Sequence, residues 1–279
     1  MLEKEIELYD EERDLIFRKK EDGTLSIVGT RESQREYIIP MEYEGVSVTS
    51  IDDWVFDECN DLLSIIIPDS VISVGFLAFN RCSNLKNILV SDGNKFYSTI
   101  GGVLFDKKAE TIICYPAGKT ESEYTIPESV TSIDNSAFYD CNSLTSIVIP
   151  DSVSSIGDFA FSGCSNLTSI VIPNSVTSIG DNAFDYCSSL TTIVIPNSVT
   201  SIGDYSFGEC SSLTTIDIPS SVTSLGYYAF SGCNNLTEII INRKHDGTLS
   251  DAPWGGDEDS FGRKKTIKVI WLDETVLYE

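Results

Sequence analysis

The pattern of apolar residues repeats every 23 positions in the second half of the chain. Near-identical copies of LTSIVIPNSVTSIGDNAFDYCSS begin at Leu144, Leu167, Leu190 and Leu213, and a partial copy opens at Leu236. Self-similarity at a period of about 20–29 residues is typical of a solenoid, in which each repeat forms one rung and cannot bury its own apolar face. The sequence therefore predicts a stack of rungs whose length depends on the number of repeats.

Each repeat begins with a predicted strand. In the copy that starts at Leu167, Ile170 and Ile172 alternate with Val171, so the two isoleucines are expected to face the core and the valine to face outward. Pro173 ends the strand, because proline has no N–H to donate to a parallel ladder.

The rest of the repeat predicts a second short extended stretch and a helical turn. Val176 and Ile179 point inward from the second stretch, and Gly180 turns the corner. Asp181 is then expected to cap about one helical turn. The inward side of that turn carries Ala183, Phe184 and Cys187.

The repeat resembles the BspA-like class of leucine-rich repeats, with its consensus I-P-x-S-V-T-S-I-G-x-x-A-F-x-x-C, and the match covers nearly the whole chain. The fold that we expect is a right-handed leucine-rich-repeat solenoid of the α/β horseshoe class, β-dominated, with a parallel strand ladder and short helical turns. The resemblance further implies a bacterial or protist surface protein engaged in adhesion to host matrix or to other cells.

The first 33 residues are not repeats and predict a cap. Leu15–Phe17 and Thr24–Val28 have the pattern of two strands joined around Asp22-Gly23. A solenoid needs a terminal cap over its first rung, and the hairpin at 1–33 is well placed to be one. The repeats then occupy residues 34–241.

Three irregular segments interrupt or follow the repeats. Five extra residues lie within 41–47, and a 36-residue unit at 85–120 carries a predicted hairpin at 102–106 and 111–115. Residues 242–279 are expected to form a C-terminal cap, with a strand at 266–272 and with Trp254 or Phe261 covering the last rung. No low-complexity linker separates these parts, so the sequence predicts one continuous domain.

The charge balance of the chain disfavours partners that are themselves negatively charged. With 19 basic and 43 acidic residues, the formal net charge is −24. This charge disfavours nucleic acid and anionic membrane surfaces, and it leaves open a solvated acidic shell or a basic partner. The start of the chain lacks the pattern of a signal peptide, and no apolar run approaches the roughly 20 residues of a membrane span. A surface or secreted location by resemblance and a cytoplasmic one both stay open.

Seven of the eight cysteines occupy one repeat position. In stacked rungs about 4.8 Å apart their parallel Cβ atoms would lie too far apart for the roughly 3.8 Å of a disulfide. We therefore expect free, buried thiols, and we leave the state of Cys114 open. The seven are Cys59, Cys82, Cys141, Cys164, Cys187, Cys210 and Cys233.

No catalytic, cofactor or metal site emerges from the sequence. Asp158, Asp181 and Asp204 repeat at one position, where three helix caps are favoured over a calcium site. The only histidine, His245, stands in a predicted surface loop, and there is no CxxC pair or phosphate-binding loop. The sequence thus predicts a protein without enzymatic activity, cofactor or metal.

The outward side of the strand ladder is the candidate binding face. A long apolar stripe there would be unusual for a lone monomer, although valine and threonine also simply suit strands. The irregular segments 41–47, 91–120 and 242–265 are the better places for specificity. The candidate face comprises Ile66, Val148, Val171, Val194, Asp217 and Ile240, with Thr168, Thr191 and Thr214 beside them.

These observations favour a non-catalytic scaffold, monomeric, that binds another protein or a surface polymer. Nucleic acid and direct membrane insertion are not expected. An intracellular leucine-rich-repeat adaptor or inhibitor is the alternative, and an enzyme has no constellation of residues in its support.

Overall fold

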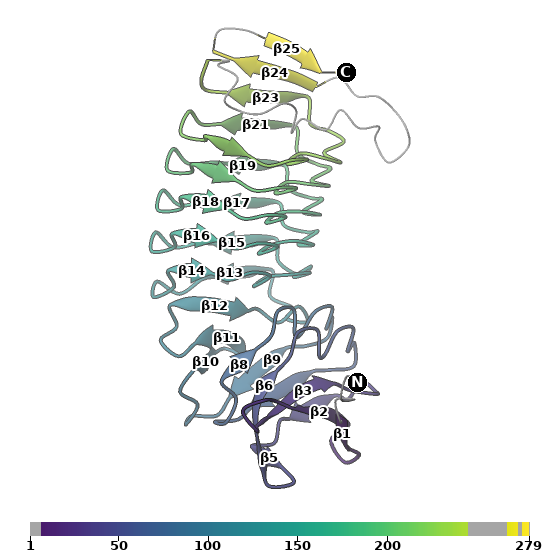
Figure 1. The fold of residues 1–279 in the computed structure, drawn as a ribbon. Helices are drawn as coiled ribbons and strands as arrows, with labels where there is room; N and C mark the ends of the chain where they lie inside the picture. The colour runs from purple at the N-terminus through teal and green to yellow at the C-terminus, as the bar shows by residue number, and fades with distance from the viewer. Residues whose placement is uncertain (1–6, 245–266, 273–274, 279) are drawn as a thin grey trace, which may run out of the picture. The chain divides into compact units, whose positions relative to one another are not determined.

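The computed structural model describes residues 7–244, 267–272 and 275–278. Contacts divide the chain into two units, residues 1–119 and 120–279, which we call the N-unit and the C-unit (Figure 1). The boundary falls at the end of the hairpin-bearing segment 85–120. The predicted division into caps and repeats, and the single continuous domain, stay predictions.

The first ladder of the C-unit is formed by the predicted strands, which stack in parallel. The paired strands are in register at a spacing of 23 residues, so Ile147, Ile170 and Ile193 align directly, and Ile216 aligns with Ile239. The ladder is divided into two sheets between residues 194 and 215. The strands are β13 (Glu123–Thr125), β15 (Ser146–Val148), β17 (Ser169–Val171), β19 (Thr192–Val194), β21 (Thr215–Ile218) and β23 (Glu238–Ile241).

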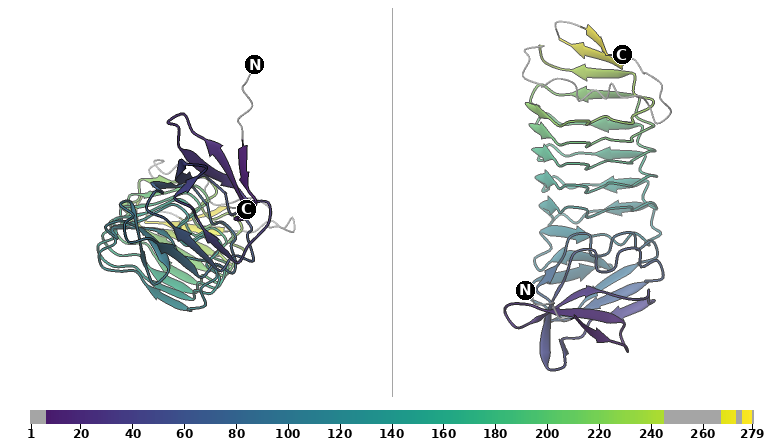
Figure 2. Two further views of the ribbon diagram at one scale, coloured as in Figure 1. Left: turned by 90° about the horizontal axis from the view of Figure 1, so that it is seen from below. Right: turned by 45° about the vertical axis from the view of Figure 1, so that its right-hand side comes forward.

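The second ladder is also parallel and consists of two-residue strands. Ser155 pairs with Ser178 and Ile156 with Ile179, which again is a spacing of 23. Figure 2 shows the stacked rungs of this unit from a second side. The strands are β14 (Ser132–Ile133), β16 (Ser155–Ile156), β18 (Ser178–Ile179), β20 (Ser201–Ile202) and β22 (Ser224–Leu225).

The third side of each rung is not helical, and the predicted helical turn is wrong. Asn182 and Tyr186 have φ angles of 55° and 58°, in the left-handed region, which breaks a helix into two consecutive tight turns. In this conformation alternate backbone N–H groups point toward the next rung. Asn182 N donates to Asp204 O at 2.7 Å, and Phe184 N donates to Ser206 O at 2.7 Å. The described chain contains no helix.

The cap assigned to the repeated aspartates is wrong for the same reason. Asp181 N donates to Asp158 Oδ1 at 2.9 Å, and Asp204 N donates to Asp181 Oδ1 at 2.8 Å. Each carboxylate therefore binds the backbone of the following rung instead of capping a helix. Gly180 permits the close approach, because a Cβ there would lie 2.6 Å from Asp158 Oδ1 and from the Gly157 carbonyl carbon.

Columns of identical side chains fill the interior of the C-unit. Phe161 and Phe184 stack with ring centroids 5.2 Å apart, and Phe207 continues the column at 5.5 Å. The inward Ile170 and Ile172 are both 4 % exposed. Because every rung places the same apolar residues over those of its neighbours, burial depends on stacking, as expected for a repeat array.

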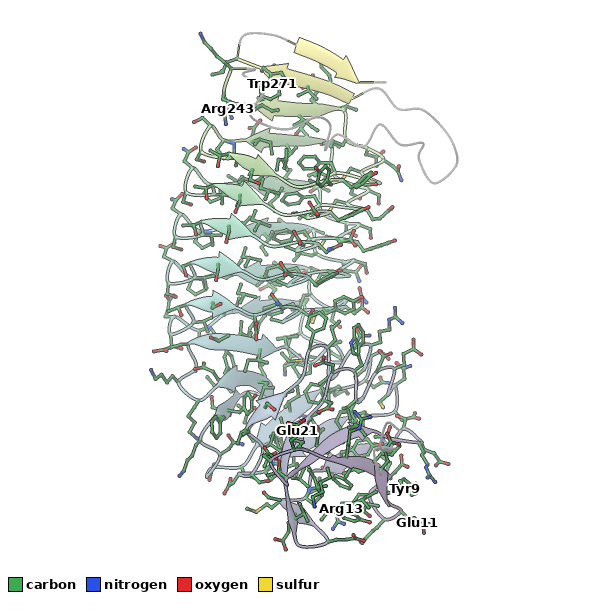
Figure 3. The ribbon with its side chains drawn as sticks, in the orientation of Figure 1. Tyr9, Glu11, Arg13, Glu21, Arg243 and Trp271 are labelled. Carbon is green, nitrogen blue, oxygen red and sulfur yellow. The ribbon has the colours of Figure 1, made fainter. Side chains whose placement is uncertain are left out.

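The C-terminal end of the C-unit is an antiparallel pair. The strand expected at 266–272 is present as β24 (Ile267–Trp271), parallel to β23, and β25 (Thr275–Tyr278) pairs with it in the antiparallel sense. Trp271 is buried, and Arg243 Nη1 donates to Val222 O at 3.2 Å (Figure 3). The candidate capping residues Trp254 and Phe261 lie outside the described residues.

The N-unit begins with three strands, of which the sequence predicted two. β2 (Leu15–Lys19) and β3 (Leu25–Gly29) form the expected hairpin, and β1 (Glu7–Asp10) adds an unpredicted antiparallel strand to β2. β3 pairs in parallel with β6 (Val46–Ile51), so the hairpin extends the second ladder of the first rung.

Two rungs and part of a third follow in the N-unit. β4 (Glu36–Ile38), β7 (Ser64–Ile67) and β9 (Asn87–Val90) form a parallel ladder, and β8 (Ser73–Val74) pairs with β6. The extra residues at 41–47 form an arm in which β5 (Glu42–Tyr43) pairs antiparallel with the start of β6.

The hairpin predicted within 85–120 is present and has one more strand. β11 (Val103–Asp106) and β12 (Thr111–Cys114) pair antiparallel, and β10 (Tyr97–Ile100) precedes them. Gly101 and Gly102 both have positive φ angles, as the tight turn between β10 and β11 requires. Asp106 Oδ1 accepts N–H bonds from Glu110 and Thr111, both at 2.7 Å, which closes the next turn.

Candidate binding surfaces

Three valines of the candidate face form one exposed line on the C-unit. Val148, Val171 and Val194 occupy the same register position in β15, β17 and β19, and they are 57 %, 72 % and 69 % exposed. Exposure of this degree is high for valine, which usually lies inside a protein. We call these three residues the valine stripe.

The threonines beside the valine stripe are exposed, but the hydroxyls of Thr168 and Thr191 are hydrogen-bonded. Thr168 Oγ1 donates to Thr145 O at 3.2 Å, and Thr191 Oγ1 donates to Thr168 O at 3.3 Å. Thr214 is exposed at the next position, where its carbonyl accepts from Thr237 Oγ1. Because the hydroxyls bond to the backbone of the preceding rung, these columns present a largely ordered surface with few free donors.

The structure does not bring all the predicted face residues together. Asp217 follows in β21 as an exposed carboxylate that interrupts the apolar column, and Ile240 beside it in β23 is half-buried. Ile66 belongs to the N-unit, where it pairs with Ile38 and Leu89, two exposed residues that sequence reasoning missed.

The irregular segments carry surfaces of their own. The arm at 41–47 and the three strands β10–β12 are both formed in the N-unit. The arm exposes Met41, and the segment around β10 exposes Phe96 and Ile100. The third segment, 242–265, is described only to Lys244, so most of it, together with His245, lies outside the described residues.

The ladder cysteines are free and buried, as expected. Cys187 Sγ lies 3.2 Å from Phe161 O, and Cys210 Sγ lies 3.1 Å from Phe184 O, so each thiol can donate to the preceding rung. Burial raises the pKa of both thiols well above the ordinary value. Cys114 is free and half-buried, and burial raises its pKa to about 12. These thiols are therefore protonated and poorly nucleophilic near neutral pH.

The described acidic residues are not grouped as a metal site would require. Within the described ranges, no group of three or more His, Cys, Asp and Glu side chains is placed to hold a metal ion. In the same part of the chain, no helix has the length and apolarity that crossing a bilayer requires.

A second surface of the C-unit was missed by sequence reasoning. The tight-turn segments are 134–140, 157–163, 180–186, 203–209 and 226–232, and the last three bring exposed tyrosines beside carboxylates. Here Tyr186 is 58 % and Tyr205 is 41 % exposed, and Tyr205 stacks on Tyr228 at a centroid distance of 5.1 Å. The signal in the sequence is the appearance of Tyr186 and Tyr227 at positions where most other repeats have glycine or acidic residues.

Burial and the neighbouring Glu209 raise the pKa of Asp185 on this second surface to about 6. A backbone N–H bond from Tyr186 opposes the shift only in part. Two carboxylates are thus close enough to repel each other on a surface that also exposes aromatic rings.

Solved structures with the same fold come from several bacteria. A leucine-rich cell surface protein from Faecalibacterium prausnitzii is 21 % identical with a TM-score of 0.61, covering 90 % of this chain and 100 % of that one. The pneumococcal vaccine antigen PcpA is 16 % identical with a TM-score of 0.59, covering 95 % and 93 %. A leucine-rich repeat protein from Bacteroides ovatus is 32 % identical with a TM-score of 0.51, covering 87 % and 66 %. At these identities the first two likenesses show the fold alone.

The family of the chain is identified from its sequence. No curated protein is significantly similar to the chain. The profile of the BspA type leucine rich repeat region, however, matches residues 41–116 and 114–237, in six copies. The matched residues include every strand from β5 to β22. The chain therefore belongs to the BspA-type leucine-rich repeat family.

Proposed function

We propose that the chain is a non-catalytic scaffold that binds another protein or a surface polymer through the valine stripe, and that it acts in adhesion at a cell surface. The observation that carries the proposal is the exposure of three aligned valines, each of which lies between two buried isoleucines. The leucine-rich cell surface protein of Faecalibacterium prausnitzii, which has the same fold, supports the location.

The energetics favour contact along the whole stripe. Burying an aliphatic side chain of this size is worth roughly 1.5–3 kcal/mol. A partner that covers all three valines would therefore gain several kcal/mol before the cost of association. Because the strand backbones and the threonine hydroxyls are already hydrogen-bonded, little ordering of the scaffold is needed on binding.

The test replaces the stripe while the core stays unchanged. In the variant Val148→Lys/Val171→Lys/Val194→Lys, three like charges stand on the stripe and every inward residue is kept. The matched control is Ser154→Lys/Thr177→Lys/Thr200→Lys, which changes three exposed residues at the same 23-residue spacing beside the second ladder. Both variants change the net charge equally.

Binding is measured by surface plasmon resonance to purified extracellular-matrix proteins (fibronectin, laminin, fibrinogen and collagen) and to bacterial cell-wall polysaccharide. We expect the stripe variant to lose at least about tenfold in affinity for whichever of these the natural chain binds, and the control to stay within about threefold. Equal losses in both variants would show that the stripe is not the binding surface. A natural chain that binds none of the panel would contradict the adhesive role.

A further inference from the structure

The repeats of the C-unit contain no positive side chain. Between Thr120 and Asn242 there is no lysine, arginine or histidine, whereas thirteen residues are acidic. Seven of the thirteen lie on the tight-turn segments, which we call the turn face: Asp134, Asp140, Asp158, Asp181, Asp185, Asp204 and Glu209. Within the described repeats, the charged side chains of this face are therefore all negative.

Asp185 and Glu209 take a different position from the repeated aspartates Asp158, Asp181 and Asp204. Asp158, Asp181 and Asp204 accept backbone N–H groups of the following rung. Asp185 and Glu209 instead extend over glycines of the following rung, because a Cβ at Gly208 would clash with Asp185 and one at Gly232 with Glu209. The positions of these two carboxylates depend on Gly208 and Gly232, which have no Cβ and therefore leave space beside them.

The room beside them is a cavity of about 250 Å³. Two carboxylates and two tyrosines line it, and its other walls are small or amide residues, so no positive charge is contributed by the lining. The lining residues are Asn182, Asp185, Tyr186, Tyr205, Gly208, Glu209 and Ser231.

The chemistry of this lining fits one class of ligand group. A guanidinium or ammonium group placed over a tyrosine ring is attracted by the ring, and it pairs with a carboxylate at the same time. An anion would be repelled, and a neutral apolar group would bury Asp185 further without a partner. The cavity therefore favours the head group of arginine or lysine.

We propose that the turn face of the C-unit is the docking surface for an arginine- and lysine-rich polypeptide, one of whose side chains enters the cavity between Asp185, Glu209 and the rings of Tyr186 and Tyr205. The surface is distinct from the valine stripe, and the inference does not depend on the function proposed for that stripe. Burial and repulsion by Glu209 raise the pKa of Asp185 to about 6, and a bound cation opposes both effects because it stabilises the charged carboxylate.

The test uses the full chain and a defined probe. A fluorescein-labelled peptide of nine alternating arginine and glycine residues is titrated at 150 mM NaCl, and anisotropy is measured. The site variant is Asp185→Asn/Glu209→Gln. The control is Asp151→Asn/Asp217→Asn, which removes the same charge from exposed carboxylates of the C-unit outside the turn face. Thermal unfolding checks that each variant folds, and Glu209→Gln alone replaces the double variant if that one does not.

We expect the site variant to lose at least about tenfold in affinity and the control to lose less than about threefold. Tyr186→Leu should lose several-fold, whereas Tyr186→Phe, which keeps the ring, should bind as the natural chain does. No binding to the natural chain, or equal losses in the site and control variants, would overturn the proposal. Displacement of the peptide by micromolar spermine or calcium would likewise overturn it, because the occupant would then be a small cation.

Discussion

The two units stack their rungs in the same way but distribute charge differently. The N-unit sequence has 13 basic and 22 acidic residues, and ion pairs such as Arg13–Asp10 and Arg81–Glu58, both at 2.8 Å, cross its surface. The C-unit sequence has no basic residue from Thr120 to Asn242. The difference shows that the repeats stack without ion pairs, because apolar columns and hydrogen bonds between rungs are sufficient. The carboxylates of these repeats that do not bond to a neighbouring rung are left for solvent or a partner.

The largest expected effect separates the inside of the C-unit from its outside. Ile172→Ala deletes buried methyl groups from a central rung and should lower the free energy of unfolding by about 2–5 kcal/mol. Val171→Ala, one residue away but 72 % exposed, should cost less than about 1 kcal/mol. Hydrogen exchange read by mass spectrometry should accelerate in C-unit peptides and stay constant in N-unit peptides. Equal acceleration in both would show that the two units unfold together.

The next effect comes from Asp185 and depends on pH. Because its pKa is higher in the folded chain than the ordinary 3.8, the folded chain binds more protons than the unfolded one between pH of about 4 and 6. Stability from this group is therefore present below pH 4 and is lost as the pH rises to about 6.

Asp185→Asn removes this dependence. It should raise the free energy of unfolding by about 1–2 kcal/mol at pH 7.5, a figure reduced for the solvent screening of this partly exposed carboxyl, and change it little at pH 3.5. Urea titration measures both values. Asp151→Asn, an exposed carboxylate of the same unit, is the control and should change stability little at either pH. A destabilised Asp185→Asn at pH 7.5 would contradict the repulsion described for the turn face.

Salt should act on one unit more than on the other. Raising NaCl from 20 mM to 500 mM screens repulsion between the uncompensated carboxylates of the C-unit and should stabilise it by roughly 0.5–1 kcal/mol. In the N-unit the same screening weakens attractions and repulsions together, so the net change should be smaller. Hydrogen exchange of the two sets of peptides measures both responses. Equal stabilisation of the two units would show that their different charge balance does not affect their stability.

The smallest effect concerns the thiols. Cys187→Ser places a hydroxyl where a weakly polar sulfur lies beside Phe161 O, and it should cost about 1 kcal/mol or less in thermal or urea unfolding. In the native chain, Cys114 of the N-unit, half-buried, should react with a thiol reagent before any ladder cysteine. All eight should react once the chain is unfolded, and recovery of paired ladder cysteines by peptide mapping would contradict their free state.

The sequence was sufficient for the ladders because their pattern is local. Alternation of Ile170, Val171 and Ile172, ended by Pro173, already determines which side chains face inward. The turn face was different: Ala183, Phe184 and Cys187 have a spacing that suits a helical turn equally well. What excludes the helix is the left-handed conformation of Asn182 and Tyr186, which is set by hydrogen bonds to the next rung and not by residue type.

The terminal strands and the cavity beside Asp185 were also missed, because they too depend on contacts between rungs or strands and not on the pattern within one repeat. Strands β1 and β25 extend the ends of the sheets and belong to no repeat, so no periodic signal identifies them. The cavity beside Asp185 needs Gly208 and Ser231 from two further rungs. Side chains from three rungs meet there only after stacking, and a single copy of the repeat shows none of this.

The C-unit is proposed to present two independent binding faces, the valine stripe and the turn face, on one shared core. Affinities of the natural chain, the Val148→Lys/Val171→Lys/Val194→Lys variant and the Asp185→Asn/Glu209→Gln variant, each measured against the matrix panel and the arginine–glycine peptide, test it most directly. The account predicts that the stripe variant loses its panel ligand and keeps the peptide within about threefold, and that the turn-face variant does the reverse. Loss of both ligands, or of neither, in either variant would contradict it.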